Sequence, residues 1–490
     1  MNLFKERIGD LSAQVWKSAA EELEFSRITG FSEDEICFLT FSAGEIKKRQ
    51  ELFHDVTSNP GLAERLSEVV TLVNDLEEVR RRAVVYPSKS AEQTLYTIRS
   101  FSLLFAAADV ISSIDREYSG RIKSERLTAF FEDAEKFGRE EGFEQDREYV
   151  ESTASGAEYT KSMTLCVNLD AKLEPYEVGV ISVHDKPFVS TSVFTGLLGD
   201  RSASQIKHIS PLVPISSSAA VKDAVYQYLN NGVSKSLRKK AESMTPRMSR
   251  YIEYFSGIKE EFSFILHALR FLDDLKPYAK ALCYPGVSED FSTTELYSEK
   301  LCVAHRGDVV PNDVKRIGER KMYLLTGANN GGKSVFINMV GVTQLLFQLG
   351  LPVPARTSEM RIFKKIFCHF PNVTADRDSR FADECRRMKN ITGGMDGETL
   401  ILMDESFSST GDDEGAEVAL GVLRKIENAG AVCFFSTHLH ALGNLVKDGT
   451  LGMEPMAIAM DGDEPTYRVV YGRLDDYSHA MRIAEQFGLV

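Results

Sequence analysis

The spacing of apolar residues predicts helices in the first third of the chain and a small sheet after it. Between residue 1 and about 150, apolar side chains recur at three- and four-residue intervals, for example in residues 46–53 and 62–82. This spacing places them on one face of a helix. Residues 162–169 and 177–183 are instead rich in β-branched side chains, and Pro175 lies between them. That combination predicts a two-stranded hairpin.

Helical spacing returns from residue 219 to about 282, and the pattern changes again in the last third. There, short continuous apolar runs end near residues 325, 403 and 435. Such runs are typical of parallel strands that helices cover on both faces. We therefore predict a multidomain protein. An α-helical domain would occupy 1–285, with a small β insertion at about 155–220, and an α/β domain would occupy 286–490.

The composition is that of a soluble globular protein, with 43% hydrophobic and 27% charged residues. Because the chain has no apolar run of about 18 residues and its N-terminus lacks the apolar core of a signal peptide, we expect a cytoplasmic protein without membrane association. Its seven cysteines include no C-x-x-C pair, which argues against a zinc site and a disulfide framework. The net charge of −14 means that nucleic acid could be contacted only through a local basic patch.

A glycine-rich segment follows the apolar run that ends at residue 325. Gly327, four further residues and then Gly332, Lys333 and Ser334 fit the phosphate-binding pattern G-x-x-x-x-G-K-[ST]. Glycines let backbone N–H groups converge on phosphate oxygens, and the next helix presents its positive dipole end to them. Lys333 is predicted to reach the β- and γ-phosphates. The predicted nucleotide contacts are Gly327, Asn329, Asn330, Gly331, Gly332, Lys333, Ser334 and Val335.

Two adjacent carboxylates end the next apolar run. Asp404 is predicted to hold Mg²⁺ together with the Ser334 hydroxyl, and Glu405 is predicted to orient and deprotonate the attacking water. The two side chains could simply solvate a strand end, but the glycine-rich loop 71 positions upstream favours the catalytic interpretation. His438 follows the third apolar run and is predicted to contact the γ-phosphate; His440 is a weaker candidate.

Two polar segments have less specific interpretations. Ser379 and Glu384 lie in a polar turn before a predicted helix, where a serine commonly caps the first turn. A basic neighbourhood contains Lys235, Arg238, Lys239, Lys240, Arg247 and Arg250. It could line a phosphate backbone or be a solubilising helix face, and the sequence favours neither.

Together these motifs resemble the ATPase domain of the MutS family of ABC-type P-loop ATPases. The resemblance rests on the glycine-rich loop, Ser-x-Phe-x-x-Glu at 379–384, Met-Asp-Glu at 403–405, the 410–415 loop and Ser-Thr-His at 436–438. Further similarities are residues 310–313, Tyr467, Gly472 and residues 478–488. Residues 46–52 and 272–275 resemble the family's helical lever domain more weakly.

The resemblance implies an ATPase that uses ATP and Mg²⁺. It also implies a homodimer through the ATPase domains, in which Ser379 and Glu384 lie opposite the partner's γ-phosphate. The implied function is clamp-like binding of mismatched, branched or duplex DNA in mismatch repair, other DNA repair or recombination. The alternative is an ATPase switch that acts on a protein partner without direct DNA recognition. The short segment between the loop and Ser379 disfavours a transporter ATPase.

Several residues depart from the family pattern. Ala328, Asn330 and Val335 stand where the family usually has proline, methionine and threonine, and Arg380 and Ala382 alter the segment expected to face the partner. Because Lys333 and Ser334 are kept, we expect nucleotide binding to persist while coupling between subunits differs. We also expect the chain to lack the family's N-terminal mismatch-reading domain and its C-terminal helix-turn-helix, and therefore not to read mismatches directly.

Overall fold

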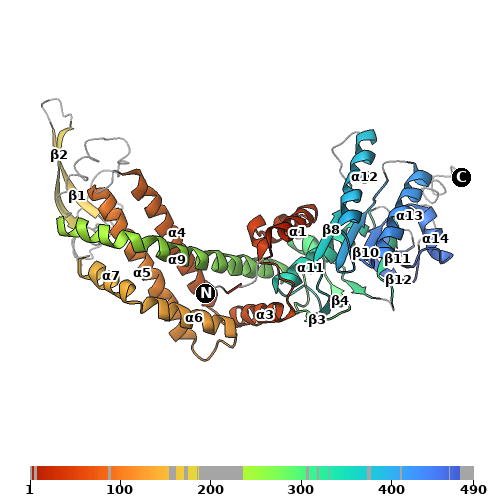
Figure 1. Ribbon diagram of the computed structural model, residues 1–490, viewed down its shortest axis with the longest axis horizontal. Coiled ribbons are helices and arrows are strands. Elements are labelled where there is room, and N and C mark those ends of the chain that lie inside the picture. Colours follow the sequence, from red (N-terminus) through yellow and green to blue (C-terminus); the bar gives the residue numbers. More distant parts are fainter. Residues whose placement is uncertain are drawn as a thin grey trace, which may run out of the picture. The chain divides into compact units, whose positions relative to one another are not determined.

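The computed structural model of the chain (Figure 1) describes residues 3–4, 8–86, 90–153, 162–169, 171, 175–184, 186, 235–304, 308–316, 319–328, 330–371, 377–408, 411–462 and 464–474. Asn329, the helix start predicted at 219 and the similarity at 478–488 lie outside these residues. The contacts divide the chain into two compact units. The sheet unit comprises Met1–Ala63, Gly120–Ala129 and Ser263–Val490, and the helical unit comprises Glu64–Ser119 and Phe130–Phe262.

Long amphipathic helices form the helical unit, as the apolar spacing predicts. They are α4 (Leu62–Val85), α5 (Ala91–Tyr118), α6 (Glu125–Gly138), α7 (Glu141–Thr153) and α9 (Lys235–Leu275); α4, α6 and α9 also extend into the sheet unit. Helix α4 buries Leu66, Val69, Val73 and Leu76, which its 3.6-residue period places on one face.

Aromatic side chains fill the core of the helical unit. The ring of Phe143 on α7 lies 5.1 Å from that of Phe105 on α5 and 5.3 Å from that of Tyr251 on α9. The segment Gln93–Tyr118 of α5 is the only helix in the described part of the chain that is long and apolar enough to cross a membrane. Half of its most apolar window is buried, and its aromatic residues pack against α7 and α9. This packing is that of a core helix.

The predicted β insertion contains the expected hairpin. Strand β1 (Ser162–Leu169) pairs antiparallel with β2 (Pro175–His184), close to the bounds that the sequence predicts. Helix α9 then continues through Pro246.

The sheet unit is built on a six-stranded sheet with the order β12-β11-β6-β10-β9-β8, part of which is labelled in Figure 1. All neighbouring pairs are parallel except β11 and β12. The strands are β6 (Met322–Thr326), β8 (Lys365–His369), β9 (Thr399–Asp404), β10 (Val432–Ser436), β11 (Met453–Asp461) and β12 (Glu464–Tyr471). The apolar runs of the last third are therefore buried parallel strands, as predicted.

Helices cover both faces of this sheet. They are α11 (Lys333–Leu349), α12 (Arg377–Gly394), α13 (Asp412–Ala429) and α14 (His440–Lys447). Ile401 and Met403 of β9 pack with residues of α12, α13 and α14 in one apolar cluster. Leu402 has the opposite orientation in the pleat, and its Cδ1 would lie 2.6 Å from a Cβ placed on Gly341 of α11. Helix α11 therefore covers the other face.

A second sheet and the N-terminal segment complete this unit. The sheet has the order β3-β7-β4-β5, with β3 (Gly286–Val287), β4 (Ser292–Leu296), β5 (Asn312–Lys315) and β7 (Thr357–Met360); α10 (Glu299–Val303) follows β4 in the chain. The N-terminal elements are α1 (Asp10–Glu22), α2 (Phe25–Thr29), the 3₁₀ helix η1 (Glu33–Phe38) and α3 (Ala43–Ser58).

Side-chain contacts explain why the first 63 residues belong to the sheet unit. On α1, the Trp16 Nε1 donates to the Lys364 carbonyl oxygen at 3.1 Å. The Leu23 carbonyl oxygen accepts a hydrogen bond of 2.8 Å from Asn338 Nδ2 on α11. The units thus do not follow chain order, and the domain boundary predicted near residue 285 stays a prediction.

Candidate functional site

Three parallel strands end together at one edge of the six-stranded sheet. Ser436 of β10 is in register with Leu325 of β6 on one side and with Asp404 of β9 on the other. The pairing continues past the strands, because Thr437 N donates to Leu325 O at 3.0 Å and Glu405 N donates to Ser436 O at 2.9 Å. The glycine-rich loop, the two carboxylates and the segment with His438 therefore leave the sheet side by side. Ligands of parallel α/β sheets bind at this edge.

The loop between β6 and α11 needs its glycines. Gly327 and Gly332 have φ angles of 136° and 95°, a range that favours glycine. A Cβ on Gly331 would lie 3.0 Å from the Ala328 carbonyl oxygen, and Gly331 N already donates to that oxygen at 3.1 Å. Among the other predicted loop residues, Asn330 is exposed with a φ of 63°. The loop is a tight turn whose backbone a side chain would disturb.

Lys333 is the first residue of α11 and lies beneath the loop. Its side chain is almost fully buried, and its Nζ donates to the carbonyl oxygens of Gly327 at 2.7 Å and Ala328 at 3.1 Å. The next residue, Ser334, is exposed and Val335 is half-buried. The ammonium group and the start of α11 therefore lie at the same point, where both would attract an anion.

The two carboxylates differ in environment. Asp404 is 8% exposed and accepts a hydrogen bond from the Ser436 hydroxyl. Glu405 is half-buried and has a φ of 45°, a left-handed conformation that is unfavourable for a residue with a Cβ. Asp404 is thus held by its neighbouring strand, while Glu405 is the first residue of a turn beyond it.

The oxygen groups at this edge fit Mg²⁺. Within the described ranges there is no group of three or more His, Cys, Asp or Glu side chains that could hold a metal ion. Mg²⁺ usually keeps several waters and binds through one or two carboxylates together with substrate phosphates. Asp404 supplies one carboxylate and Ser334 supplies one exposed hydroxyl. These two ligands fit a Mg²⁺ site that phosphates and water complete better than a site made entirely of protein ligands.

The structure places the remaining predicted residues in different surroundings. His438 is exposed directly after β10. Glu384 on α12 is 2% exposed, and its Oε2 accepts a hydrogen bond of 3.0 Å from Phe407 N, so it has a contact inside its own chain. Ser379 lies in the first turn of α12, and its side chain is outside the described residues, as is Asn329. The contacts predicted across a dimer stay predictions.

Two residues close to this edge were not among the predicted site residues. The Asn312 side chain bonds to two positions of β12, donating to Tyr467 O at 3.0 Å and accepting from Val469 N at 2.7 Å. His369, the last residue of β8, bonds to Ser406 in the turn after Glu405. Asn312 lies in a segment already noted for its similarity to the family. His369 had no local signal, since its contacts depend on the pairing of β8 with β9.

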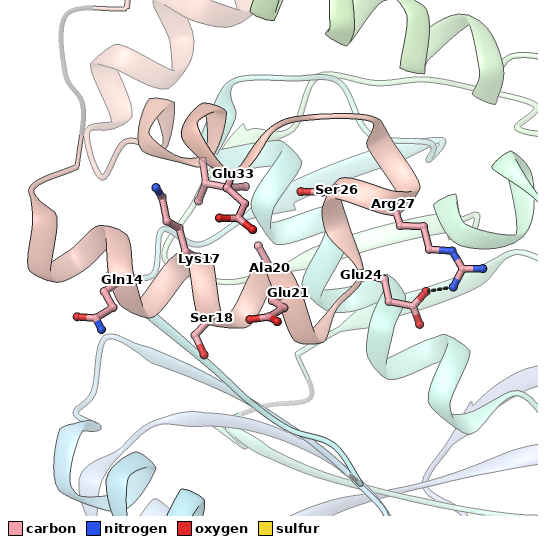
Figure 2. Close-up of a pocket in the computed structure, with 10 residues that line it drawn as sticks. Gln14, Lys17, Ser18, Ala20, Glu21, Glu24, Ser26, Arg27 and Glu33 are labelled. Atoms are coloured by element: carbon pink, nitrogen blue, oxygen red, sulfur yellow. Dashed lines mark hydrogen bonds and ion pairs between the residues drawn. The ribbon is translucent and has the colours of Figure 1, made fainter. Parts of the chain in front are cut away.

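A separate hollow of about 480 Å³ lies on the N-terminal elements. Figure 2 shows charged side chains of both signs around it, including Lys17 and Glu21 of α1 and Glu33 of η1, and Glu24 paired with Arg27. None of its lining residues belongs to the glycine-rich loop or to the strand ends. We therefore place the candidate site at the strand ends.

Fold and site define the C-terminal part of the chain as an α/β domain with a binding edge at the carboxyl ends of parallel strands. Residues 323–488 match the family model described as MutS domain V. The chain thus contains a domain that matches the MutS family.

Curated relatives named Endonuclease MutS2 are similar over a longer stretch. The protein of Aquifex aeolicus is 28% identical over 271 residues, which cover 54% of this chain and 35% of the relative. That of Pediococcus pentosaceus is 28% identical over 306 residues, or 61% and 38% of the two chains. That of Thermomicrobium roseum is 32% identical over 226 residues, or 44% and 28%. The matched stretches span well under half the length of these relatives.

Proposed function

We propose that this chain is a MutS-type ATPase that uses Mg²⁺ and converts ATP and water to ADP and phosphate. The observation that supports it best is the parallel register of β6, β10 and β9. That register gathers the glycine-rich loop, Asp404 with Glu405, and His438 at one sheet edge. The family match over the same residues supports the same activity.

Each residue has a defined role in this proposal. Lys333 and the loop amides bind the phosphates and stabilise the charge that develops on them. Glu405 orients the attacking water and takes its proton, and His438 donates to the γ-phosphate. Ser334 and Asp404 would hold Mg²⁺, which neutralises phosphate charge when bound.

Two substitutions test the activity. Glu405→Gln keeps the size of the side chain but removes the base, so we expect kcat to fall by about 10²-fold or more while ATP still binds. Lys333→Ala should weaken ATP binding by roughly tenfold to a hundredfold, since it removes charged hydrogen bonds. Glu417→Gln, an exposed position on α13, is the matched control. ATP hydrolysis and fluorescent-nucleotide binding are measured on all three variants. Full hydrolysis in Glu405→Gln would contradict the proposed base.

We further propose that the ATPase domains form a homodimer and that ATP drives clamp-like binding of mismatched, branched or duplex DNA in the cytoplasm. The MutS family match supports DNA as the partner. Part of the basic neighbourhood on α9 is available for such contacts: Lys239 is exposed, and Arg238 and Lys240 are partly so. Phosphate contacts of this kind set position on DNA rather than sequence preference.

A second candidate is an ATPase switch that acts on a protein partner. It is favoured by the internal pairing of two of the basic residues. Arg247 donates to the buried carboxylate of Asp146, with its Nε 2.8 Å from Oδ2, and Arg250 Nη2 donates to Glu140 Oε1 at 2.6 Å. These two guanidinium groups therefore contribute less positive charge than the sequence suggests.

Hydrolysis rates with homoduplex, mismatched and four-way-junction DNA separate the two candidates. Stimulation by one DNA, lost in Glu405→Gln, would establish a DNA-responsive ATPase. Glu405-dependent hydrolysis that no DNA changes would favour the protein partner.

A further inference from the structure

His369 joins the turn that carries Glu405 to helix α12. It is the last residue of β8 and is in register with Met403 of β9. Its imidazole Nδ1 lies 2.6 Å from Ser406 Oγ, and its Nε2 lies 3.1 Å from the Glu384 carbonyl oxygen on α12. The ring is 1% exposed and lies 5.6 Å from the Phe407 ring. Both nitrogens thus have partners, and the partners belong to different elements.

The partners fix the hydrogen positions on the ring. A carbonyl oxygen can only accept, so Nε2 carries the hydrogen that reaches Glu384 O. In a neutral imidazole Nδ1 then accepts. The Ser406 hydroxyl has one hydrogen and two acceptors within reach, Nδ1 at 2.6 Å and the His369 carbonyl oxygen at 3.1 Å, and it donates to the nearer one, Nδ1. The neutral form is the expected one, because burial, with a smaller contribution from the charge of Arg387, lowers the pKa of His369 to about 4. His369 therefore forms a directional link between Ser406 and Glu384.

Helix α12 holds the turn that carries Glu405 at a second point. Glu384 Oε2 accepts from Phe407 N at 3.0 Å, so α12 contacts the turn through its backbone, by way of His369, and through this carboxylate. The turn needs such support. Glu405 and Phe407 have φ angles of 45° and 64°, and residues in this region persist only where the surrounding structure holds them there.

We propose that His369 is a positioning residue: through Ser406 it fixes the turn that presents Glu405, and through Glu384 it ties that turn to α12. The inference rests on the proposed ATPase function, in which Glu405 is the base. Because α12 also carries Ser379 in its first turn, a shift of this helix would be transmitted to Glu405 through the same link.

Two substitutions remove the link without touching the nucleotide residues. His369→Phe fills the ring volume but removes both ring contacts, and it keeps the backbone carbonyl that the Ser406 hydroxyl can reach. Ser406→Ala removes both contacts of the hydroxyl and keeps the bond from the ring to Glu384. We expect each to lower kcat by roughly tenfold or more, since small displacements of a catalytic group are costly, with the KM for ATP changed less than twofold. The double variant should be no slower than the slower single variant, because both changes break one link.

Cys368→Ala is the matched control. Cys368 precedes His369 on β8 and is buried, but its Sγ lies 3.9 Å from Ala19 O on α1, so it points away from the turn. We expect Cys368→Ala to affect stability and to leave kcat within twofold of wild type. A second readout needs no activity: the Phe407 amide should exchange its hydrogen faster in His369→Phe than in wild type or Cys368→Ala.

The outcomes separate this inference from the proposed function. If wild type shows Glu405-dependent hydrolysis while His369→Phe and Ser406→Ala keep kcat within twofold, the inference is wrong and the ATPase stands. If wild type does not hydrolyse ATP, the proposed function fails. Hydrogen exchange at Phe407 then still decides whether His369 holds the turn, and unchanged exchange overturns that claim.

Discussion

Single buried side chains determine how parts of this fold respond to pH, and Glu299 is the clearest case. It is fully buried next to α11, where its Oε1 accepts from Thr343 Oγ1 at 2.8 Å. Its Oε2 has no hydrogen-bond partner within the described part of the chain. Burial raises its pKa from 4.5 to about 8, because an uncompensated charge is costly in an apolar interior.

A raised acid pKa makes the folded protein less stable as pH increases. Between pH 4.5 and 8 the folded state keeps the Glu299 proton that the unfolded state releases. This stabilisation is therefore complete below pH 4.5 and is lost as pH rises through 8. Glu299→Gln removes the titration. We expect its free energy of unfolding, relative to wild type, to increase by up to about 1.4 kcal/mol per pH unit across this window.

Urea unfolding at pH 5.5, 7 and 8.5 measures this difference, with Glu417→Gln as the control for the loss of one carboxylate. Trp16 is the chain's only tryptophan and lies in the sheet unit, so its fluorescence follows the unit that contains Glu299. Parallel pH profiles for wild type and Glu299→Gln would mean that this carboxyl group is charged in the folded protein.

Local motifs predicted the positions of the site residues but not their partners. Lys333, Asp404 and Glu405 were found because the glycine-rich loop and the strand-end carboxylates are continuous in sequence. The structure places them at one sheet edge, as the pattern implies, and their roles remain proposed. The link from His369 to Ser406 depends on the register of two strands more than 30 residues apart in the chain, which no local spacing encodes.

At the scale of elements, α1 is the least expected feature, since it packs on the edge strand β8 of the main sheet. In addition to the Trp16 bond, Glu22 Oε2 accepts from Arg387 Nη2 of α12 at 2.6 Å and from Phe370 N at 3.3 Å. Burial raises the pKa of Glu22 despite the nearby guanidinium, so Arg387 offsets only part of the cost of burying this carboxylate.

Arg387→Ala should therefore loosen α1. It leaves Glu22 without its ion partner, and we expect a loss of about 1–2 kcal/mol, a value reduced because both side chains are about a quarter exposed. The transition followed by Trp16 fluorescence should move to lower urea concentration. Lys17→Ala on the same helix removes a pair whose Asp34 side chain is 98% exposed, and should change stability by less than about 0.5 kcal/mol. Equal shifts in the two variants would count against the Arg387 contact.

An amphipathic pattern identifies the buried face of α1 but not what covers it. Trp16 is fully buried on that face, yet its hydrogen-bond partner Lys364 lies 348 positions away. The helices and the strands β6, β9 and β10 of the main sheet were predictable because their apolar patterns are local. The packing of α1 against β8 was not, since it depends on two surfaces that meet only in the folded chain.

At the scale of the whole molecule, the chain leaves the sheet unit and returns to it twice. Residues 120–129 lie between two segments of the helical unit but belong to the sheet unit. Asp55 of α3 explains this, since its Oδ2 accepts from Lys123 N at 2.7 Å and from Ser124 N at 2.6 Å. A division into consecutive domains could not have foreseen it, because the contacts join segments that are 68 residues apart.

The net charge of −14 limits how this molecule can hold DNA. Arg247 and Arg250 are paired with carboxylates of their own chain. In the described part of the basic neighbourhood, the side chains that could contact DNA phosphates are therefore Arg238, Lys239 and Lys240. Lys240 Nζ lies over the Tyr149 ring at 5.1 Å, which still leaves its charge for a phosphate. Each phosphate contact contributes about −0.9 to the slope of log affinity against log salt on duplex DNA. If this patch carries DNA binding, we expect a slope near −3 per chain.

Charge reversal at one residue tests that count. Lys239→Glu should weaken binding to every DNA similarly and make the slope less steep by about 1. Arg250→Ala is the matched control: it removes a charge from the same helix, but one that Glu140 already holds, so affinity and slope should change little. Fluorescence anisotropy with labelled duplex and junction DNA over a series of salt concentrations measures both quantities. If Lys239→Glu leaves the salt slope unchanged, another surface binds the DNA. If the wild-type protein shows no salt-dependent DNA binding, the protein-partner alternative is favoured.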